Sequence, residues 1–237
     1  MTVTVGSKPK PFAWSHSALH QFENCARQYY HTKIAKDFPE VQSEANKWGL
    51  QVHKAMADRI KTGAPLPSSM PYESWIDWAT ADLHEHEIIE AELQLAVTND
   101  KIVFTPCKYF DRVVNPWFRT VADVLRIRGD RARIIDWKTG KNVDDNSDQL
   151  KLCAFAVFVH WPEVQSCTCQ YVWLQHNNFS DCQLDRKDLL EFWHPMSHRV
   201  ERMQQAIQDH EFPCRPSGLC KKHCGVRTCE YFGRGQY

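Results

Sequence analysis

The feature that most constrains this chain of 237 residues is an apolar stretch that ends abruptly in Asp136-Trp137-Lys138. Two isoleucines precede the acid and Gly140 follows the lysine, which is the pattern of a buried strand running into a turn. Because side chains alternate along a strand, Asp136 and Lys138 point the same way and Trp137 points opposite. The stretch therefore predicts a carboxylate and an ammonium side by side at the end of a strand.

In isolation, this arrangement has two interpretations. It fits a surface ion pair at a solvated strand end, which contributes little to stability. It also fits a site where the carboxylate binds a hard cation such as Mg²⁺ or Mn²⁺. The lysine would then position an attacking water or stabilise charge on a phosphate.

The residues just upstream favour the second interpretation. Residues 121–127 and 132–135 are alternating apolar runs on either side of a polar turn with Gly129, which predicts a β-hairpin. In that hairpin Asp123 lies on the strand beside Asp136. Two neighbouring carboxylates repel each other, so a fold holds them together most readily when a divalent cation binds between them. The alternative for Asp123 is a strand-edge acid paired with an arginine.

Composition excludes some classes of protein. The formal net charge is zero, so any contact with nucleic acid must come from local patches. No apolar run approaches the roughly 18 residues of a membrane span, and the first eleven residues lack the apolar core of a signal peptide. We therefore expect an intracellular, cytoplasmic protein without membrane contact. Ten cysteines in such a chain favour metal binding over disulfides.

Four of these cysteines, Cys214, Cys220, Cys224 and Cys229, fall within sixteen residues near the C-terminus. Their density, with Pro and Gly between them, predicts a closed metal site. One reading is tetrahedral Zn²⁺ on all four thiols, with His223 as an alternate ligand. The other is a 4Fe–4S cluster on the last three thiols and a cysteine from elsewhere in the chain.

Asp123, Asp136-Trp137-Lys138 and the following Thr139-Gly140-Lys141 resemble the PD-(D/E)xK nuclease superfamily, in its RecB-like exonuclease branch. Phage-encoded and CRISPR-associated RecB-type iron–sulfur exonucleases are the most similar group. Three further matches support this resemblance. Residues 15–30 are similar to the opening helix of these nucleases, and Gly49 and His53 resemble their Gly-x-x-x-His motif. Gln149 matches the glutamine of their Gln-x-x-x-Tyr motif, although Cys153 stands where that motif has tyrosine.

The resemblance implies a restriction-endonuclease-like α/β fold, with a mixed central sheet flanked by helices and a cysteine-rich, metal-stapled C-terminal tail. It assigns Lys138, Asp136, Asp123 and Gln149 to the catalytic centre. His53, Asp123 and Asp136 would hold Mg²⁺ or Mn²⁺. Cys25, Cys220, Cys224 and Cys229 would hold a 4Fe–4S cluster. The spacing here is C-x₃-C-x₄-C, whereas the commoner family pattern is C-x₂-C-x₅-C, so together with the spare Cys214 it leaves structural Zn²⁺ as the alternative.

The implied function is a metal-dependent DNA exonuclease that acts on linear single- or double-stranded DNA in phage or CRISPR-linked DNA processing or recombination. If phage-encoded, it would work in the host cytoplasm. One alternative is a catalytically silent DNA-binding or scaffold subunit with a recombination or CRISPR-adaptation partner. Another is an endonuclease with the same core.

We expect one nuclease domain over residues 1–237. It comprises N-terminal helices (13–62), a catalytic sheet core (88–184), and a C-terminal helix with the cysteine-rich tail (186–237). Beyond the hairpin, helices are expected over 15–34, 43–62, 72–85, 148–160 and 186–210, and strands over 88–97, 102–104, 166–174 and 179–184. Glu92 is a candidate for a further acid near the metals, or a solvated strand residue. Arg119, Lys141 and Lys151 either guide the phosphate backbone or are solvated.

Overall fold

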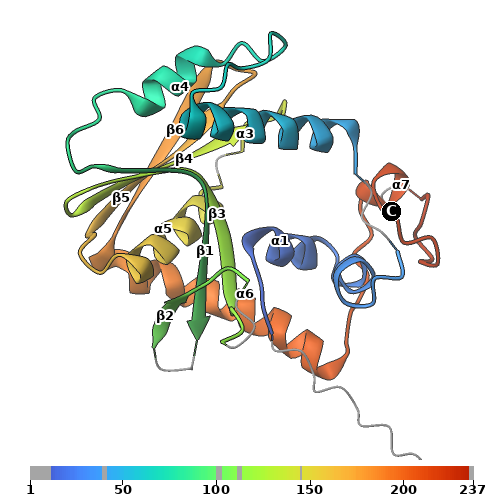
Figure 1. Ribbon diagram of the computed structural model, residues 1–237. Coiled ribbons are helices and arrows are strands. Elements are labelled where there is room, and N and C mark those ends of the chain that lie inside the picture. Colours follow the sequence, from blue (N-terminus) through green and yellow to red (C-terminus); the bar gives the residue numbers. More distant parts are fainter. Residues whose placement is uncertain (1–11, 39–41, 100–102, 111–113, 145, 235–237) are drawn as a thin grey trace, which may run out of the picture.

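The computed structural model of the protein describes residues 12–38, 42–99, 103–110, 114–144 and 146–234. Its centre is a six-stranded sheet with the strand order β2-β1-β3-β4-β5-β6 (Figure 1). The strands are β1 (Ile88–Asn99), β2 (Phe104–Cys107), β3 (Phe118–Arg128), β4 (Arg131–Lys138), β5 (Ser166–Trp173) and β6 (Asn178–Asp185). The pairing of β4 with β5 is parallel and the other pairings are antiparallel. The expected mixed central sheet is confirmed.

Helices cover both faces of this sheet (Figure 1). One face packs against α3 (Glu44–Thr62) and α4 (Glu73–Thr80). The other packs against α1 (His16–Asn24), α5 (Asp148–His160) and α6 (Leu189–Asp209). Two short helices, α2 (Ala26–Tyr29) and α7 (Leu219–Lys222), belong to the region where the N-terminal helices meet the C-terminal tail. In the described part of the chain, no helix is both long and apolar enough to cross a membrane.

Alternation along β4 divides the apolar core into two layers. Ile134 packs with α5 and its neighbours, whereas Ile135 and Trp137 pack on the opposite face beneath α3 and α4. Helix α5 is apolar on nearly all sides because it lies between the sheet and α6, which is typical of a fully buried helix. Asp136 and Lys138 share the face of Ile134, so they point toward α5.

The predicted hairpin is confirmed. Its register runs from Arg128 opposite Arg131 to Val124 opposite Ile135, and Gly129 in the turn has a φ of 57°, which favours glycine. Helix α3 also begins and ends as expected. The Ser43 side chain accepts a hydrogen bond from Asn46 N, and Gly63 closes the helix in the left-handed conformation. Helix α5 matches its predicted range.

The prediction of a continuous helix over 15–34 was wrong at Cys25. This residue is extended, with φ −162° and ψ 105°, and it separates α1 from α2. The break leaves the amide of Arg27 free to donate to Pro213 O at 3.3 Å, so the N-terminal helices bond directly to the C-terminal tail. A π-helical turn, Tyr30–Ile34, completes the segment.

Three other boundaries differ from the predictions. The helix expected over 72–85 ends at Thr80, where Arg126 caps its last carbonyls and the chain turns away. The strand expected over 102–104 is described only from Phe104 onward, and residue 102 lies outside the described residues. The helix expected from 186 opens as a 3₁₀ turn, Arg186–Asp188, before α6, which continues through Pro195.

Candidate active site

The site lies where β3 and β4 separate. The last paired residues are Val124 and Ile135, and one further step in the same register puts Asp123 opposite Asp136. Beyond this point the backbone amide of Trp137 donates to Asp123 Oδ2 at 2.9 Å. The carboxylate thus replaces a backbone partner in the ladder, which fixes Asp123 at the fork between the two strands.

Gln149 in the first turn of α5 connects the other two residues of the motif. Its Nε2 donates to Asp136 Oδ1 at 2.6 Å, and its Oε1 accepts from Lys138 Nζ at 2.8 Å. Lys138 Nζ also lies 2.7 Å from Asp136 Oδ2. Amide, ammonium and carboxylate therefore hold one another in place, and none of the three side chains is free to rotate away.

His53 reaches the fork from α3, on the opposite face of the sheet. Its Nδ1 lies 3.0 Å from Asp123 Oδ1. Burial disfavours the charged imidazole, but the hydrogen bond and charge of Asp123 outweigh this, and the pKa of His53 is raised. Helix α3 packs closely because Gly49 has no side chain: a Cβ there would lie 3.0 Å from Thr139 Oγ1.

Asp136 is the electrostatically unusual group of the site. Burial raises its pKa to about 6, with nearby Asp123 adding to the shift and Lys138 opposing it. Its Oδ2 is buried and, despite its closeness to Lys138, accepts no hydrogen bond of good geometry in the described part of the chain. The site therefore contains a carboxylate oxygen whose charge is incompletely compensated.

These side chains line one cavity of about 420 Å³. Its walls include four residues that sequence reasoning did not place at the site: Ser15, His16, Ser17 and Tyr109. Burial, followed by the nearby His20, lowers the pKa of His16 to about 4, so its imidazole is neutral at neutral pH. Its Nε2 has no hydrogen-bond partner among the described residues. Arg119, a predicted guide for the phosphate backbone, also lines the cavity and donates to Tyr109 O.

Comparison with protein-family profiles decides the family. The profile described as "PD-(D/E)XK nuclease superfamily" matches residues 13–231, nearly the whole chain. The chain belongs to the PD-(D/E)XK nuclease superfamily. A comparison with curated proteins found no match. A solved structure titled "Crystal structure of SSO0001" matches with a TM-score of 0.45 and 12% identity, over 96% of this chain and 90% of that one.

Members of this superfamily are nucleases that generally use divalent metals and act on DNA. Asp123 and Asp136 offer the oxygen ligands that such hard cations prefer, and the buried Oδ2 of Asp136, which accepts no hydrogen bond of good geometry, fits a further positive charge beside Lys138. However, no three His, Cys, Asp or Glu side chains in the described part of the chain are grouped to hold a metal ion. His53 contacts Asp123 directly, and its role as a ligand stays a prediction.

Tyr171 is a neighbour of the motif that the sequence did not reveal. It lies opposite Asp136 on the parallel strand β5, and Lys138 Nζ sits 4.6 Å from the centre of its ring. Lys138 thus contacts a phenol from another element, while Cys153, at the position where the family motif has tyrosine, is buried in the core. Nothing in the sequence indicated this, because the pairing of β4 with β5 depends on how α5 crosses the sheet.

Glu92, the candidate for a further acid near the metals, does not line the cavity. The register of β1 with β3 would place Glu92 opposite Asp123. However, the backbone of Glu92 adopts a φ of 52° within β1, and its carboxylate pairs with Lys61 on α3 at 3.3 Å. Two directly opposed carboxylates would repel each other, which favours this outward turn. Lys141 and Lys151 do not line the cavity either; Lys151 lies beside Phe192 of α6.

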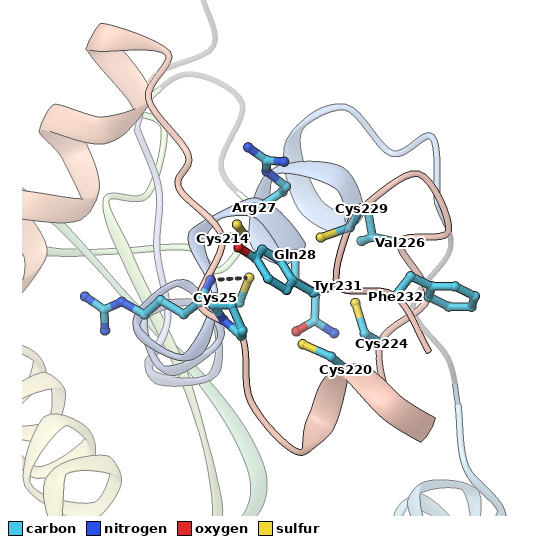
Figure 2. Close-up of a pocket in the computed structure, with 12 residues that line it drawn as sticks. Cys25, Arg27, Gln28, Cys214, Cys220, Cys224, Val226, Cys229, Tyr231 and Phe232 are labelled. Atoms are coloured by element: carbon cyan, nitrogen blue, oxygen red, sulfur yellow. Dashed lines mark hydrogen bonds between the residues drawn. The ribbon is translucent and has the colours of Figure 1, made fainter. Parts of the chain in front are cut away.

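The cysteines form a second cavity, between the N-terminal helices and the tail (Figure 2). Its walls contain all five candidate thiols, Cys25, Cys214, Cys220, Cys224 and Cys229. Backbone amides donate to two of the sulfurs, Arg215 N to Cys25 at 3.5 Å and Ser217 N to Cys220 at 3.4 Å. None of the ten cysteines, all of which lie among the described residues, forms a disulfide. Donated N–H groups suit thiolate ligands, but no three described thiols are grouped to hold a metal ion.

Proposed function

We propose that the chain is a metal-dependent DNA exonuclease that hydrolyses phosphodiester bonds at the fork between β3 and β4. The observation that supports this most strongly is the connected set of contacts around one cavity. His53 holds Asp123, and Gln149 holds both Asp136 and Lys138. Asp123 and Asp136 would hold Mg²⁺ or Mn²⁺, and His53 would complete the site. A cation held there supplies Lewis-acid polarisation of the phosphate.

The protein's own groups would do the remaining work. Lys138 would position the attacking water and offset the negative charge that develops on the phosphoryl oxygens. Gln149 would keep the ammonium and Asp136 in register with each other. Arg119 and the neutral imidazole of His16, both on the cavity wall, would contact the non-bridging oxygens of the substrate.

The likeness of the motifs to phage-encoded and CRISPR-associated exonucleases supports a role in DNA processing or recombination. The test is to incubate end-labelled linear single- and double-stranded DNA, and a closed circle, with Mg²⁺, with Mn²⁺ and with chelator. We expect metal-dependent loss of linear DNA only. A cut circle would indicate an endonuclease. Binding without cleavage by folded protein would indicate a silent DNA-binding or scaffold subunit.

We further infer that Cys25, Cys220, Cys224 and Cys229 bind a 4Fe–4S cluster with a structural role. The shared cavity and the backbone N–H groups donated to sulfur support this proposal. Such a cluster would supply no step of phosphodiester hydrolysis; it would join the two ends of the chain. Zinc on the tail thiols is the alternative, and elemental analysis of anaerobically purified protein distinguishes iron from zinc.

A further inference from the structure

A second charged surface lies at the other end of the hairpin from the catalytic cavity. Two arginines of β3 and two of β4 face each other directly: Arg126 is opposite Arg133, and Arg128 is opposite Arg131. Because each pair of positions on one strand is two residues apart, all four side chains lie on the same face of the sheet. Together they line a groove of about 410 Å³, the arginine groove, beside Trp78 of α4.

Two of these arginines are held in place by the protein. Arg126 is buried, and its guanidinium bonds to Glu87 Oε1 at 2.6 Å and to the carbonyls of Ala79 and Ala81. Arg133 donates Nε to Gln170 Oε1 at 2.7 Å, and its guanidinium carbon lies 4.0 Å from the centre of the Trp78 ring. Arg126 therefore forms the wall of the groove, whereas Arg133 has two terminal nitrogens without a partner in the described part of the chain.

The other two arginines have carboxylates nearby, Asp82 in the groove and Asp130 in the turn between them, but no ion pair with either among the described residues. Arg128 and Arg131 are exposed, and neither forms an ion pair among the described residues. Glu87 also lines the groove but is already bound to Arg126, which leaves Asp82 as the remaining groove carboxylate. Beyond Arg131, Lys187 adds another positive charge, and Asp185 there already accepts from Ser166 and Gln183. Like charges directly opposed across two strands are destabilising, so these opposed arginines lower the stability of the fold.

We propose that the arginine groove binds the phosphate backbone of a nucleic-acid strand outside the catalytic cavity. Arginine, unlike lysine, presents planar paired donors that match a phosphate, and all four cations here are arginines. β4 connects the two sites, since it runs from Arg131 in the groove to Lys138 in the cavity. Its seven steps of roughly 3.3 Å separate them by about 23 Å. This proposal rests on the proposed function in one respect, the choice of nucleic acid as the ligand.

The test measures DNA binding without cleavage, in the Lys138→Ala chain with chelator present. Fluorescence anisotropy of a labelled duplex of about 30 base pairs gives the binding constant at several salt concentrations. Arg128→Gln with Arg131→Gln is expected to reduce the slope of log K against log salt by about 1.8, since each lost phosphate contact removes about 0.9. The control, Arg202→Gln with Lys222→Gln, removes the same charge from exposed positions on α6 and α7 and is expected to keep the slope.

Equal slopes in the two double variants would overturn the proposal. So would an unchanged DNA slope combined with groove-dependent binding of polyglutamate, which would indicate an acidic protein partner. Thermal melting checks the fold, and removing opposed like charges is expected to leave the melting temperature unchanged or higher. Because the readout is binding, a groove-dependent slope combined with no DNA cleavage by the parent chain in Mg²⁺ or Mn²⁺ would refute the proposed function and support this inference. Cleavage of DNA by the parent chain combined with an unchanged salt slope in the groove variant would support the proposed function and refute this inference.

Discussion

At the scale of single residues, the site depends on side chains that orient other side chains through hydrogen bonds. Asp136 and Lys138 lie on one strand face, as the sequence predicted, but their orientation comes from Gln149 on a different element. The side-chain amide of Gln149 donates from Nε2 to Asp136 and accepts at Oε1 from Lys138. Burial raises the pKa of Asp136 to about 6, near neutrality, and the charge of Lys138 opposes this shift, so this contact favours the ionised carboxylate that a cation would need.

The first prediction concerns Gln149→Leu, which keeps the size of the side chain and removes both hydrogen bonds. We expect kcat for DNA cleavage to fall about 10- to 100-fold, the range typical when a supporting contact of a metal ligand is lost. KM should change little, because Gln149 is not a charged contact to DNA. Steady-state kinetics measures both. Gln205→Leu, the same change at an exposed position of α6, is the control, and equal kinetics for the two variants would contradict the role of Gln149.

At the scale of elements, the site depends on how closely α3 approaches the end of β4. Gly49 permits this approach, and it lies one helical turn before His53. In Gly49→Ala the new Cβ would meet Thr139 Oγ1 at 3.0 Å, so one of the two must move by a few tenths of an ångström. Moving α3 would carry His53 away from Asp123.

We therefore expect Gly49→Ala to lower the cleavage rate about 10-fold while changing the free energy of unfolding by less than about 1 kcal/mol, because alanine stabilises a helix by a similar amount. Removing Oγ1 with Thr139→Ala should restore most of the lost rate in the double variant. Single-turnover rates of the four chains complete the cycle. Strictly additive losses would show that the contact does not position α3.

A second element-scale prediction concerns the junction of α4 with β1, where Glu87 holds Arg126. Arg126 lowers the pKa of Glu87 through their hydrogen bond, against the effect of burial. The ionised pair therefore stabilises the fold above the unfolded-state pKa of Glu87, and this stabilisation disappears as pH falls through the lower, folded-state pKa.

Glu87→Gln should reduce the free energy of unfolding at pH 7 by about 1.5–3 kcal/mol, typical of a hydrogen bond to a charged group. The difference from the parent should shrink as the pH falls through the folded-state pKa of Glu87. Denaturant unfolding over a pH series measures this difference, and Glu90→Gln, an exposed neighbour on β1, is the control. A difference that persists at the acid end of the series would refute the charge-dependent account.

Elements with strong local signals were predictable from the sequence. Gly129 marked the hairpin, and the range predicted for α3 ended just before Gly63, because turn and cap residues act over a few positions. Features that depend on distant contacts were not predictable. Cys25 breaks its helix to contact the tail, Glu92 turns outward toward α3, and Tyr171 reaches Lys138 through a parallel strand pairing.

At the scale of the whole molecule, the C-terminal tail returns to the N-terminal helices (Figure 1). Arg215 illustrates this, because its backbone amide donates to Cys25 and its side chain to Glu23 O. Metal binding by thiols from both ends would contribute directly to folding and would restrict the unfolded chain.

Cys229→Ser should therefore lose bound iron and lower the melting temperature by several degrees, with roughly 2–4 °C lost per kcal/mol in a chain of this size. Iron content and thermal melting of anaerobically purified protein measure the effect. Cys107→Ser on β2, outside the cysteine cavity, should retain iron. Iron loss without any change in melting temperature would contradict a structural role, and zinc in place of iron would favour the tetrahedral site.

We propose above all that the fork between β3 and β4 is the catalytic centre of a DNA nuclease. The most direct measurement is the single-turnover rate of linear DNA cleavage by Lys138→Ala beside Lys54→Ala, an exposed lysine of α3 paired with Asp58. We predict that Lys138→Ala lowers the rate at least about 100-fold, because it removes the charge aimed at the transition state, while DNA binding persists. Lys54→Ala should cleave like the parent. Equal cleavage by the two variants would place the chemistry elsewhere and contradict the account.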